Sequence, residues 1–441
     1  MKLDGNATGT NSKVIYLKSF GCSSNLSDGE VIAGCLTSAG YRLVNNPDAA
    51  EFLIYNTCAV KSPTENRMMN ILKRVPPQKK LIVAGCLPLI NFKRLEKAVK
   101  FHGVIGPSPG LAIVELIRKV ERGDEARFLK GNSKPDLSLP RVNTSPIVRI
   151  IPIAYGCTNT CSYCCVRFAR GKLRSYSIDE IVQKVEAVTG RGGLEIWFTG
   201  QDIAYYGRDI GTNLTTLLSR IIGINQHFLI RLGMMNPRGI PDLLPKVTAV
   251  YRHEKIFKFL HVPVQSGDDE VLKHMRRGYS IADFKKVVST FRQVAPKLTL
   301  ATDIICGFPT EDEEAFERTL RLVEVTRPDI VNISKFAPRP GTPAVRMKQI
   351  PSKEIKARSV RLAALTRRVS LENNRGWISW SGKILIDEKG YGDSWIGRNF
   401  VYKPVVVRSH QNLLGSCLEV EIIDGFPTYL KAKILHIYQT M

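Results

Sequence analysis

The sequence predicts an α/β protein of several domains, and three observations lead to that prediction. A chain of 441 residues is too long for one ordinary domain, so two or three are expected. Strand-like and helix-like patterns alternate up to about residue 340, as in parallel sheets covered by helices. From residue 377 onward, short alternating strands and glycine turns predict a small β-barrel of the OB kind.

Residues 1–140 are predicted to form a doubly wound parallel sheet. Strand patterns at 14–20, 52–56 and 81–84 alternate with helical patterns at 27–38, 92–99 and 111–122. Each strand pattern ends beside a cysteine, and these cysteines are Cys22, Cys58 and Cys86. Ligands bind at the carboxyl edge of such sheets, so the three thiols could converge on one metal cluster. Three unrelated buried cysteines are the alternative.

A second cysteine triad follows an apolar run at 148–154 that reads as a buried strand. Cys157, Cys161 and Cys164 have the spacing C-x3-C-x2-C in one short loop. Thiolates are the usual ligands of iron–sulfur clusters, and three ligands leave one iron of a four-iron cube open. A zinc site is the alternative, although structural zinc usually takes four ligands and Cys165 would be strained as the fourth.

The spacing of this second triad resembles the radical S-adenosylmethionine (SAM) superfamily, in which the open iron chelates and cleaves SAM. The resemblance implies that residues 141–340 form an open (β/α)6 barrel. Its strands are expected at 148–154, 194–199, 228–233, 257–262, 298–305 and 329–335. The motifs at 21–25, 56–60 and 84–86 are similar to the N-terminal domain of the radical SAM methylthiotransferases. That similarity implies an auxiliary 4Fe–4S cluster on the first triad.

Polar side chains at the ends of these predicted strands are candidates to hold SAM. The motifs lie at 199–202, at 261–267 and around 303, and the candidates are Thr199, Gln201, Gln265 and Asp303. Ordinary strand capping is the alternative. Many radical SAM enzymes have Gly-Gly-Glu where this chain has Thr-Gly-Gln at 199–201, and the methylthiotransferases share that departure.

The net charge of +24 points first to nucleic acid, with a generic basic surface as the alternative. Arg167, Arg170 and Arg174 follow the cysteine loop directly and are expected to contact RNA phosphates. Residues 341–376 are expected to be a linker with a long basic amphipathic helix at 353–374. That helix is interpreted as a cover of the barrel that faces RNA, or as a solvated helix face.

Residues 377–441 resemble the TRAM domain, an RNA-binding barrel. The resemblance rests on residues 397–404, in which Arg398, Phe400, Tyr402 and Lys403 would supply stacking and phosphate contacts. The alternative places Phe400 and Tyr402 in the barrel core.

The resemblance covers essentially the whole chain and is closest to the archaeal and eukaryotic branch of the family. It implies a tRNA methylthiotransferase that converts N6-threonylcarbamoyladenosine next to the anticodon into its 2-methylthio derivative, with two 4Fe–4S clusters and SAM as cofactors. Isopentenyl-adenosine tRNA or a ribosomal protein is the alternative substrate, and a zinc-stabilised, non-enzymatic RNA-binding protein is the alternative class.

The remaining expectations concern partners and location. An electron donor and a sulfur source of unknown identity are implied, and the chain is expected to be a monomer. Ten cysteines are sparse for this length and favour a reduced, cytoplasmic protein over a disulfide framework. No stretch of about 18 apolar residues exists, so no membrane span is predicted.

Overall fold

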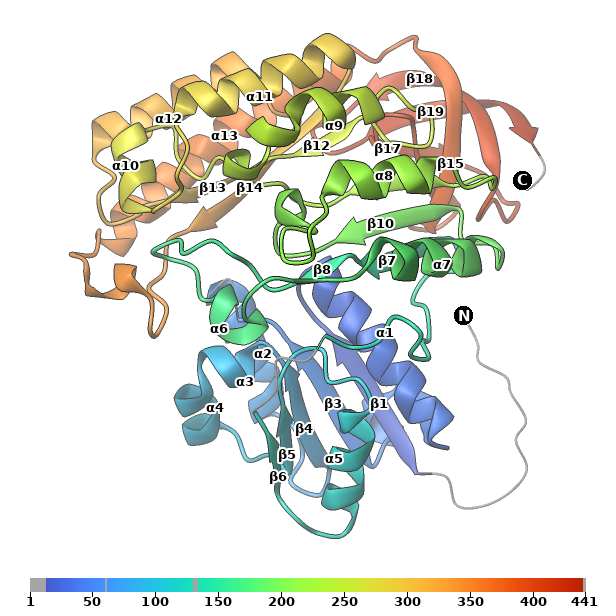
Figure 1. Cartoon of the computed structure of the whole chain (residues 1–441), viewed down its shortest axis with the longest axis vertical. Helices are drawn as coiled ribbons and strands as arrows, with labels where there is room; N and C mark the ends of the chain where they lie inside the picture. The colour runs from blue at the N-terminus through green and yellow to red at the C-terminus, as the bar shows by residue number, and fades with distance from the viewer. Residues whose placement is uncertain (1–12, 60–61, 130–133, 439–441) are drawn as a thin grey trace. The chain divides into compact units, whose positions relative to one another are not determined.

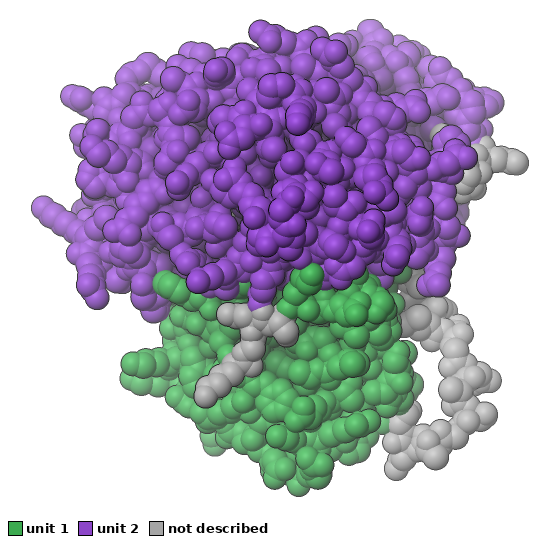
Figure 2. All heavy atoms as spheres, in the orientation of Figure 1, with its two compact units in different colours: residues 1–144, 168–170 green, residues 145–167, 171–441 purple. Residues whose placement is uncertain are grey.

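The computed structural model describes residues 13–59, 62–129 and 134–438. The chain divides into two compact units (Figure 2). Unit 1 comprises Met1–Thr144 together with Phe168–Arg170, and unit 2 comprises Ser145–Arg167 and Gly171–Met441. The finer predicted division, at residues 140, 340 and 376, stays a prediction.

Unit 1 contains a six-stranded parallel sheet in the order β2-β1-β3-β4-β5-β6. Its strands are β1 (Val14–Ser19), β2 (Arg42–Val44), β3 (Phe52–Thr57), β4 (Lys80–Gly85), β5 (Gly103–Ile105) and β6 (Ala126–Phe128). Its helices are α1 (Ser23–Ser38), η1 (Pro47–Ala49), α2 (Ser62–Lys73), α3 (Leu87–Ile90), α4 (Phe92–Ala98) and α5 (Ala112–Glu121). All six residues of β3 are buried, as expected for a central strand covered by helices on both faces. The predicted N-terminal parallel sheet is confirmed.

The order of the sheet in unit 1 reverses between β1 and β3. This is the doubly wound order in which ligands bind beyond the carboxyl ends of the strands at the reversal point. The apolar faces of α1 and α5 pack against the sheet in one core cluster with Ile15, Ile54 and Ile82. The fold therefore directs the segments that follow β1, β3 and β4 to one edge.

Unit 2 begins with six parallel strands that form two three-stranded groups, β7-β10-β11 and β12-β13-β14. They are β7 (Val148–Pro152), β10 (Glu195–Thr199), β11 (Leu229–Leu232), β12 (Phe259–His261), β13 (Thr299–Cys306) and β14 (Ile330–Lys335). A parallel bridge between Ile230 and Ile256 joins the two groups into one open series. The six strands match the predicted ones, and β8 (Ala154–Tyr155) and β9 (Arg174–Ser175) form a small ribbon beside them.

Helices cover the outside of this sheet (Figure 1). The covering helices are α7 (Ile178–Thr189), α8 (Leu214–Ile222), α9 (Leu244–Val250), α11 (Ile281–Val294) and α12 (Glu313–Thr326). The other helical segments are α6 (Val166–Arg170), of which Phe168–Arg170 belongs to unit 1, and η2 (Ile203–Tyr205), η3 (Pro237–Gly239), η4 (Pro241–Leu243), α10 (Asp269–His274) and η5 (Pro343–Arg346). Within the described residues, no helix combines the length and the apolar character needed to cross a bilayer.

The C-terminal part of unit 2 is the long helix α13 (Ser352–Arg375) followed by a closed five-stranded barrel. The barrel strands are β15 (Ser381–Lys389), β16 (Ser394–Arg398), β17 (Pro404–Arg408), β18 (Cys417–Gly425) and β19 (Leu430–Tyr438). The predicted small β-barrel is confirmed. Within the barrel the sequence pattern missed strand β16, because Gly397 reads as a turn; it lies inside the strand, where a Cβ would be 2.9 Å from Ile384. In unit 1 the pattern missed the three-residue strands β2, β5 and β6.

The turn between β16 and β17 inserts at the N-terminal ends of the six parallel strands. Tyr402 packs with Phe257 and Phe259 in a small apolar cluster, and its hydroxyl donates to Glu195 Oε1 at 3.0 Å. Lys403 Nζ lies 2.7 Å from Asp329 Oδ1, just before β14. The turn of the C-terminal barrel thus forms part of the hydrophobic core of unit 2.

Candidate active site

The loop that carries Cys157, Cys161 and Cys164 follows β7 and β8, at the C-terminal ends of the parallel strands. Gly156 has a φ of 81°, and a Cβ there would lie 1.9 Å from the carbonyl oxygen of Lys172, so only glycine fits. The Gly156 N–H donates to Gln201 Oε1 at 2.6 Å. Further along, Ser162 is buried and its hydroxyl donates to the carbonyl of His274 at 2.7 Å. The segment after β10 and the end of helix α10 therefore hold the loop on its two sides.

The three thiols of this loop lie close enough to influence one another electrostatically. Burial raises the pKa of Cys157, and it raises the pKa of Cys164 to about 12. Asn159 N–H donates to Cys157 Sγ at 3.4 Å, the kind of contact that stabilises a thiolate. Among the residues that the structure describes, no group of three His, Cys, Asp or Glu side chains forms a ready site for a metal ion.

A buried guanidinium stands against the triad. Arg277 is 5% exposed, and its Nη1 donates to Cys161 Sγ at 3.2 Å. Three thiolates can hold an iron–sulfur cluster, and the nearby cation balances the negative charge of that cluster. The residues present therefore fit the cluster that the C-x3-C-x2-C spacing implies.

Polar groups gather at the strand ends around the loop. Asp202 is buried; its Oδ2 accepts from Asn159 Nδ2 at 2.9 Å and its Oδ1 from the Asn236 N–H at 3.1 Å. Burial raises the pKa of Asp202 to about 6. Further along the same series of strands, on β13, Asp303 Oδ1 lies 3.1 Å from His261 Nε2 and accepts from Asn332 at 2.8 Å.

The four residues predicted to contact SAM differ in their burial and in their hydrogen-bond partners. Thr199 is buried at the end of β10, and Gln265 is buried with a φ of 71°, in the left-handed region. Gln201 holds the backbone of the cysteine loop through Gly156. Asp303 is partly exposed in the cluster with His261. The predicted strand-end motifs contain Asp202 and His261, although neither was chosen as a candidate, and sequence reasoning missed Asn332 and Arg277.

The first cysteine triad lies at the carboxyl edge of the sheet in unit 1. Cys22 precedes α1, Cys58 follows β3 and Cys86 precedes α3. Gly21 has a φ of 110°, and a Cβ there would lie 2.7 Å from Cys58 Cβ, so the segments around Cys22 and Cys58 approach closely. Burial raises the pKa of Cys86 to about 12, and the charges of Cys22 and Cys58 add to that shift. Three thiols facing one another at this edge fit a cluster.

Arg170 belongs to unit 1, and its position contradicts its predicted role as an RNA contact. Its side chain is 3% exposed. Arg170 Nη1 lies 2.7 Å from Asp28 Oδ2 and donates to Ser108 Oγ at 2.9 Å, and Nη2 donates to Asn25 Oδ1 at 3.3 Å. The guanidinium neutralises a buried carboxylate next to Cys86, which sequence spacing cannot reveal.

Two of the four RNA contacts predicted in the C-terminal barrel are also wrong. Tyr402 and Lys403 are 7% and 5% exposed, because they insert into the N-terminal ends of the parallel strands. Arg398 is largely covered and its Nε donates to Asp387 Oδ2 at 2.9 Å. Phe400 is 45% exposed beside Trp377 and Trp380, so it stays a candidate for stacking.

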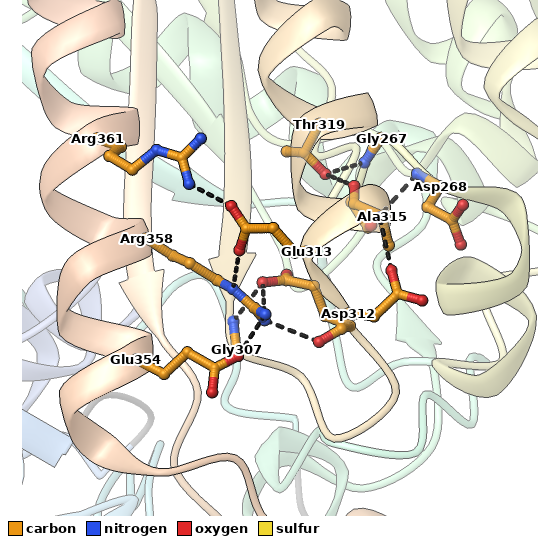
Figure 3. Close-up of polar contacts among 12 residues, drawn as sticks. Gly267, Asp268, Gly307, Asp312, Glu313, Ala315, Thr319, Glu354, Arg358 and Arg361 are labelled. Atoms are coloured by element: carbon orange, nitrogen blue, oxygen red, sulfur yellow. Dashed lines mark hydrogen bonds and ion pairs between the residues drawn. The ribbon is translucent and has the colours of Figure 1, made fainter.

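Three of the basic side chains of α13 are paired with carboxylates. Arg358 is buried, its Nη1 lies 3.0 Å from Glu311 Oε1, and it also pairs with Glu313 and Glu354 (Figure 3). Arg361 pairs with Glu313, and Arg368 Nη2 lies 3.1 Å from Glu324. Part of the expected RNA face of this helix is therefore a contact with α12 and the turn before it. The exposed basic residues that remain on α13 are Lys353, Lys356, Arg367 and Arg375.

Two adjoining crevices open beside Cys157. One of about 320 Å³ is lined by Thr158, Asn159, Tyr205, Arg208, Arg238 and Asp242. The other, of about 350 Å³, is lined by Cys157, Thr158, Arg167, Lys172, Leu173, Arg208 and Asp209. Both belong wholly to unit 2, and four of the side chains around them are cations. Arg167 thus lies where the sequence placed it, next to the loop; Arg174 is partly exposed in β9.

Comparisons with known proteins first define a class. The model of the radical SAM superfamily matches residues 151–323, and that of an "uncharacterized protein family UPF0004" matches residues 14–106. A solved radical SAM methyltransferase, TsrM from Kitasatospora setae, shares the fold with a TM-score of 0.55 at 14% identity, over 76% of this chain and 77% of its own. The chain is therefore a radical SAM protein, a class whose cofactors are a 4Fe–4S cluster and SAM.

Two named relatives then identify the family. The threonylcarbamoyladenosine tRNA methylthiotransferase of Homo sapiens is 36% identical over 95% of this chain and 73% of its own length. The "probable threonylcarbamoyladenosine tRNA methylthiotransferase" of Pyrococcus abyssi is 39% identical over 96% of this chain and 99% of its own. The chain belongs to the family of the threonylcarbamoyladenosine tRNA methylthiotransferases.

Proposed function

We propose that this protein converts N6-threonylcarbamoyladenosine next to the anticodon of tRNA into 2-methylthio-N6-threonylcarbamoyladenosine by radical SAM chemistry. Family membership supports the reaction, with relatives of that name at 36–39% identity. The observation that carries the proposal is the pairing of two cysteine triads, each at the carboxyl edge of its own parallel sheet.

Each triad is assigned one 4Fe–4S cluster. Cys157, Cys161 and Cys164 would hold the cluster that binds SAM, and Cys22, Cys58 and Cys86 the auxiliary one. When bound, the clusters and SAM supply the radical that removes hydrogen from C2 of the adenine and the sulfur that replaces it. Because burial raises the pKa of Cys86 and Cys164 to about 12, loading the thiols with iron must release protons.

Side chains at the strand ends are assigned to SAM. Asp303, oriented by His261 and Asn332, presents a carboxylate that can accept from ribose hydroxyls or an ammonium group. Gln265 lies beside Asp303 and donates its N–H to the Asp303 carbonyl at 2.8 Å, Thr199 ends β10 further along the series, and Gln201 acts through the Gly156 backbone.

The cationic crevices are assigned to the tRNA. Arg167, Lys172 and Arg208 surround the loop of Cys157, where phosphates next to the reacting base would be neutralised. Arg174 and the exposed ring of Phe400 are further candidates for RNA contact.

The other assignments concern partners and organisation. The chain acts as a monomer in the cytoplasm, where its tRNA substrate is modified, with an unidentified electron donor and sulfur source. The work is divided among residues 1–140 for the auxiliary cluster, 141–340 for SAM, 341–376 as a linker and 377–441 as the TRAM-like barrel.

Mass spectrometry of nucleosides tests the proposal. Reconstituted protein, SAM and a reductant are incubated with tRNA that carries threonylcarbamoyl-adenosine, with isopentenyl-adenosine tRNA and with ribosomal protein. Methylthiolation of the first substrate alone is expected, and modification of either of the others instead would overturn the substrate assignment.

Elemental analysis of the same preparation should find iron and sulfide; zinc alone would indicate an RNA-binding protein without this activity.

A further inference from the structure

Arg277 is held rigidly at the edge of the second cysteine triad. It follows α10, in the segment that leads into α11. Besides Cys161, its guanidinium contacts two groups: Nη2 donates to the carbonyl of Pro263 at 3.2 Å, and Nε to the hydroxyl oxygen of Tyr279 at 3.1 Å. The Tyr279 hydroxyl in turn donates to the carbonyl of Val264 at 2.7 Å. Both carbonyls come directly after β12, so the fork of the guanidinium is fixed to the sheet.

The charge of Arg277 has no carboxylate partner among the residues that the structure describes. A buried cation is costly unless a nearby anion compensates it. Asp202 is near enough to interact with that charge, but its oxygens accept from Asn159, Ala204 and Asn236. Of the groups that Arg277 contacts, the sulfur of Cys161 is the one that becomes anionic when it ligates iron. A thiolate, or an anionic centre bound to it, supplies the missing negative charge.

We propose that Arg277 is a positioning residue for the centre held by Cys157, Cys161 and Cys164. Its guanidinium orients the Cys161 thiolate and stabilises the additional negative charge that the cluster gains on reduction. Hydrogen bonds and charges at the ligating sulfur are among the levers that set the potential of such clusters. Lysine cannot replace the planar fork that reaches Cys161, Pro263 and Tyr279 together. The proposal rests on the assignment of a cluster to this triad.

The reduction potential is the direct test. In full-length protein with Cys22, Cys58 and Cys86 changed to alanine, only one cluster remains, and a potentiometric titration followed by electron paramagnetic resonance reports on it alone. Arg277→Gln removes the charge and is expected to shift the midpoint potential to more negative values. Arg276→Gln is the matched control, because Arg276 is exposed, adjacent and of the same charge. Arg277→Lys keeps the charge without the fork and is expected to shift the potential less.

The stability of the protein gives a second readout that a merely structural role would not produce. Arg277→Gln should lower the unfolding temperature of cluster-loaded protein more than that of apoprotein, since only the loaded triad carries the anion that needs the cation. Equal losses in both forms, or a potential equal to that of Arg276→Gln, would overturn the proposal. If Arg277→Gln does not fold, Tyr279→Phe, which releases Nε while keeping the charge, must shift the potential in the same direction. Absence of any iron centre in the parent would instead reject the cluster assignment.

Discussion

The two ends of the six parallel strands in unit 2 carry side chains of opposite character. At the C-terminal ends lie the cysteine loop, Asp202, Asp303 and two crevices lined by cations. At the N-terminal ends the turn of the C-terminal barrel fills the space, with Tyr402 among aromatic rings and Lys403 paired with Asp329. At the first end Asp303 and the cations that line the crevices are exposed to ligands, although Asp202 is buried. At the second end the polar groups bind one another.

This difference suggests that residues at the C-terminal ends determine the chemistry and that residues at the N-terminal ends determine the stability of the fold. Residues at the C-terminal ends can change without loss of the core, because they face ligands. Residues at the N-terminal ends are expected to affect folding and to leave the chemistry of folded molecules unchanged. The C-terminal barrel, which the sequence suggested as an RNA-binding attachment, contributes part of the core of the catalytic unit.

The largest expected effect is on activity, at the C-terminal ends. Changing Cys157, Cys161 and Cys164 together to alanine should abolish SAM cleavage and roughly halve the iron content, since the other triad keeps its cluster. The unfolding temperature of apoprotein should hardly change. Cys165→Ala is the control, because this buried neighbour is no expected ligand and its loss should preserve iron. Loss of all iron from the triple variant would contradict two independent sites.

A large effect on stability is expected at the opposite ends. Lys403→Met leaves the carboxylate of Asp329 buried without its cation, and breaking such a pair typically costs about 3–5 kcal/mol. Denaturant unfolding of apoprotein measures the loss, and Lys431→Met, at an exposed strand position of the same barrel, is the control. SAM cleavage per folded molecule should be unchanged; a specific loss of cleavage would show that the two ends are coupled.

A smaller, pH-dependent effect is expected at Glu195. Burial raises its pKa to about 7, while its ordinary value is 4.5, and Oε2 is buried without a hydrogen-bond partner among the described residues. The folded state therefore binds more protons than the unfolded state between these values, so stability present below pH 4.5 is lost as the pH rises through about 7.

Glu195→Gln removes this titration while its amide oxygen can still accept from Tyr402 and Trp197. The free energy of unfolding should then become flatter with pH, and the variant should be more stable above pH 7 by roughly 1–3 kcal/mol. Urea unfolding between pH 5 and pH 8, about the range in which most domains stay folded, measures the slope. Glu186→Gln, on an exposed face of α7, should leave it unchanged; parallel slopes in the two variants would exclude Glu195 as the titrating group.

Much of the fold was predictable because it depends on local patterns. Apolar runs mark the buried parallel strands, and cysteines placed after β1, β3 and β4 must reach one edge of the sheet. The short loop of Cys157 brings its own three thiols together through chain connectivity alone. These features require only periodicity, spacing and the geometry of parallel sheets.

The positions that were mispredicted depend on contacts between distant segments. The sequence around Arg170 looks like a solvent-exposed basic loop. Its partner Asp28 lies far earlier in the chain, in α1, so the sequence does not reveal the pair. The sequence around Tyr402 and Lys403 resembles a nucleic-acid-binding motif. In the structure both side chains instead bind buried partners, Glu195 and Asp329, from distant parts of the chain. Charge composition alone cannot say which cations are already paired, and Arg277 has no distinguishing sequence pattern.

The last prediction compares the cations that line a crevice beside Cys157 with cations that are paired with carboxylates of α12. Arg167, Lys172 and Arg208 line a crevice beside Cys157, whereas Arg361 and Arg368 are paired with carboxylates of α12. Each cation on a phosphate releases counterions, so alanine at the first three should reduce the salt dependence of tRNA affinity by up to about 0.7–0.9 per contact. Arg208 also pairs with Asp242 at 3.2 Å, so its contribution should be the smallest of the three.

Alanine at Arg361 and Arg368 is the matched control, with two positive charges removed from exposed positions of the same unit. Because their carboxylate partners remain, these variants should leave the salt slope unchanged and should weaken affinity only slightly, through the net charge. Filter-binding titrations from 50 to 200 mM salt, a range over which roughly six to ten phosphate contacts together lower affinity by about 10³–10⁵, resolve the difference. Equal slopes for the two sets would mean that RNA lies against α13, so that the cations next to the cysteine loop serve another ligand.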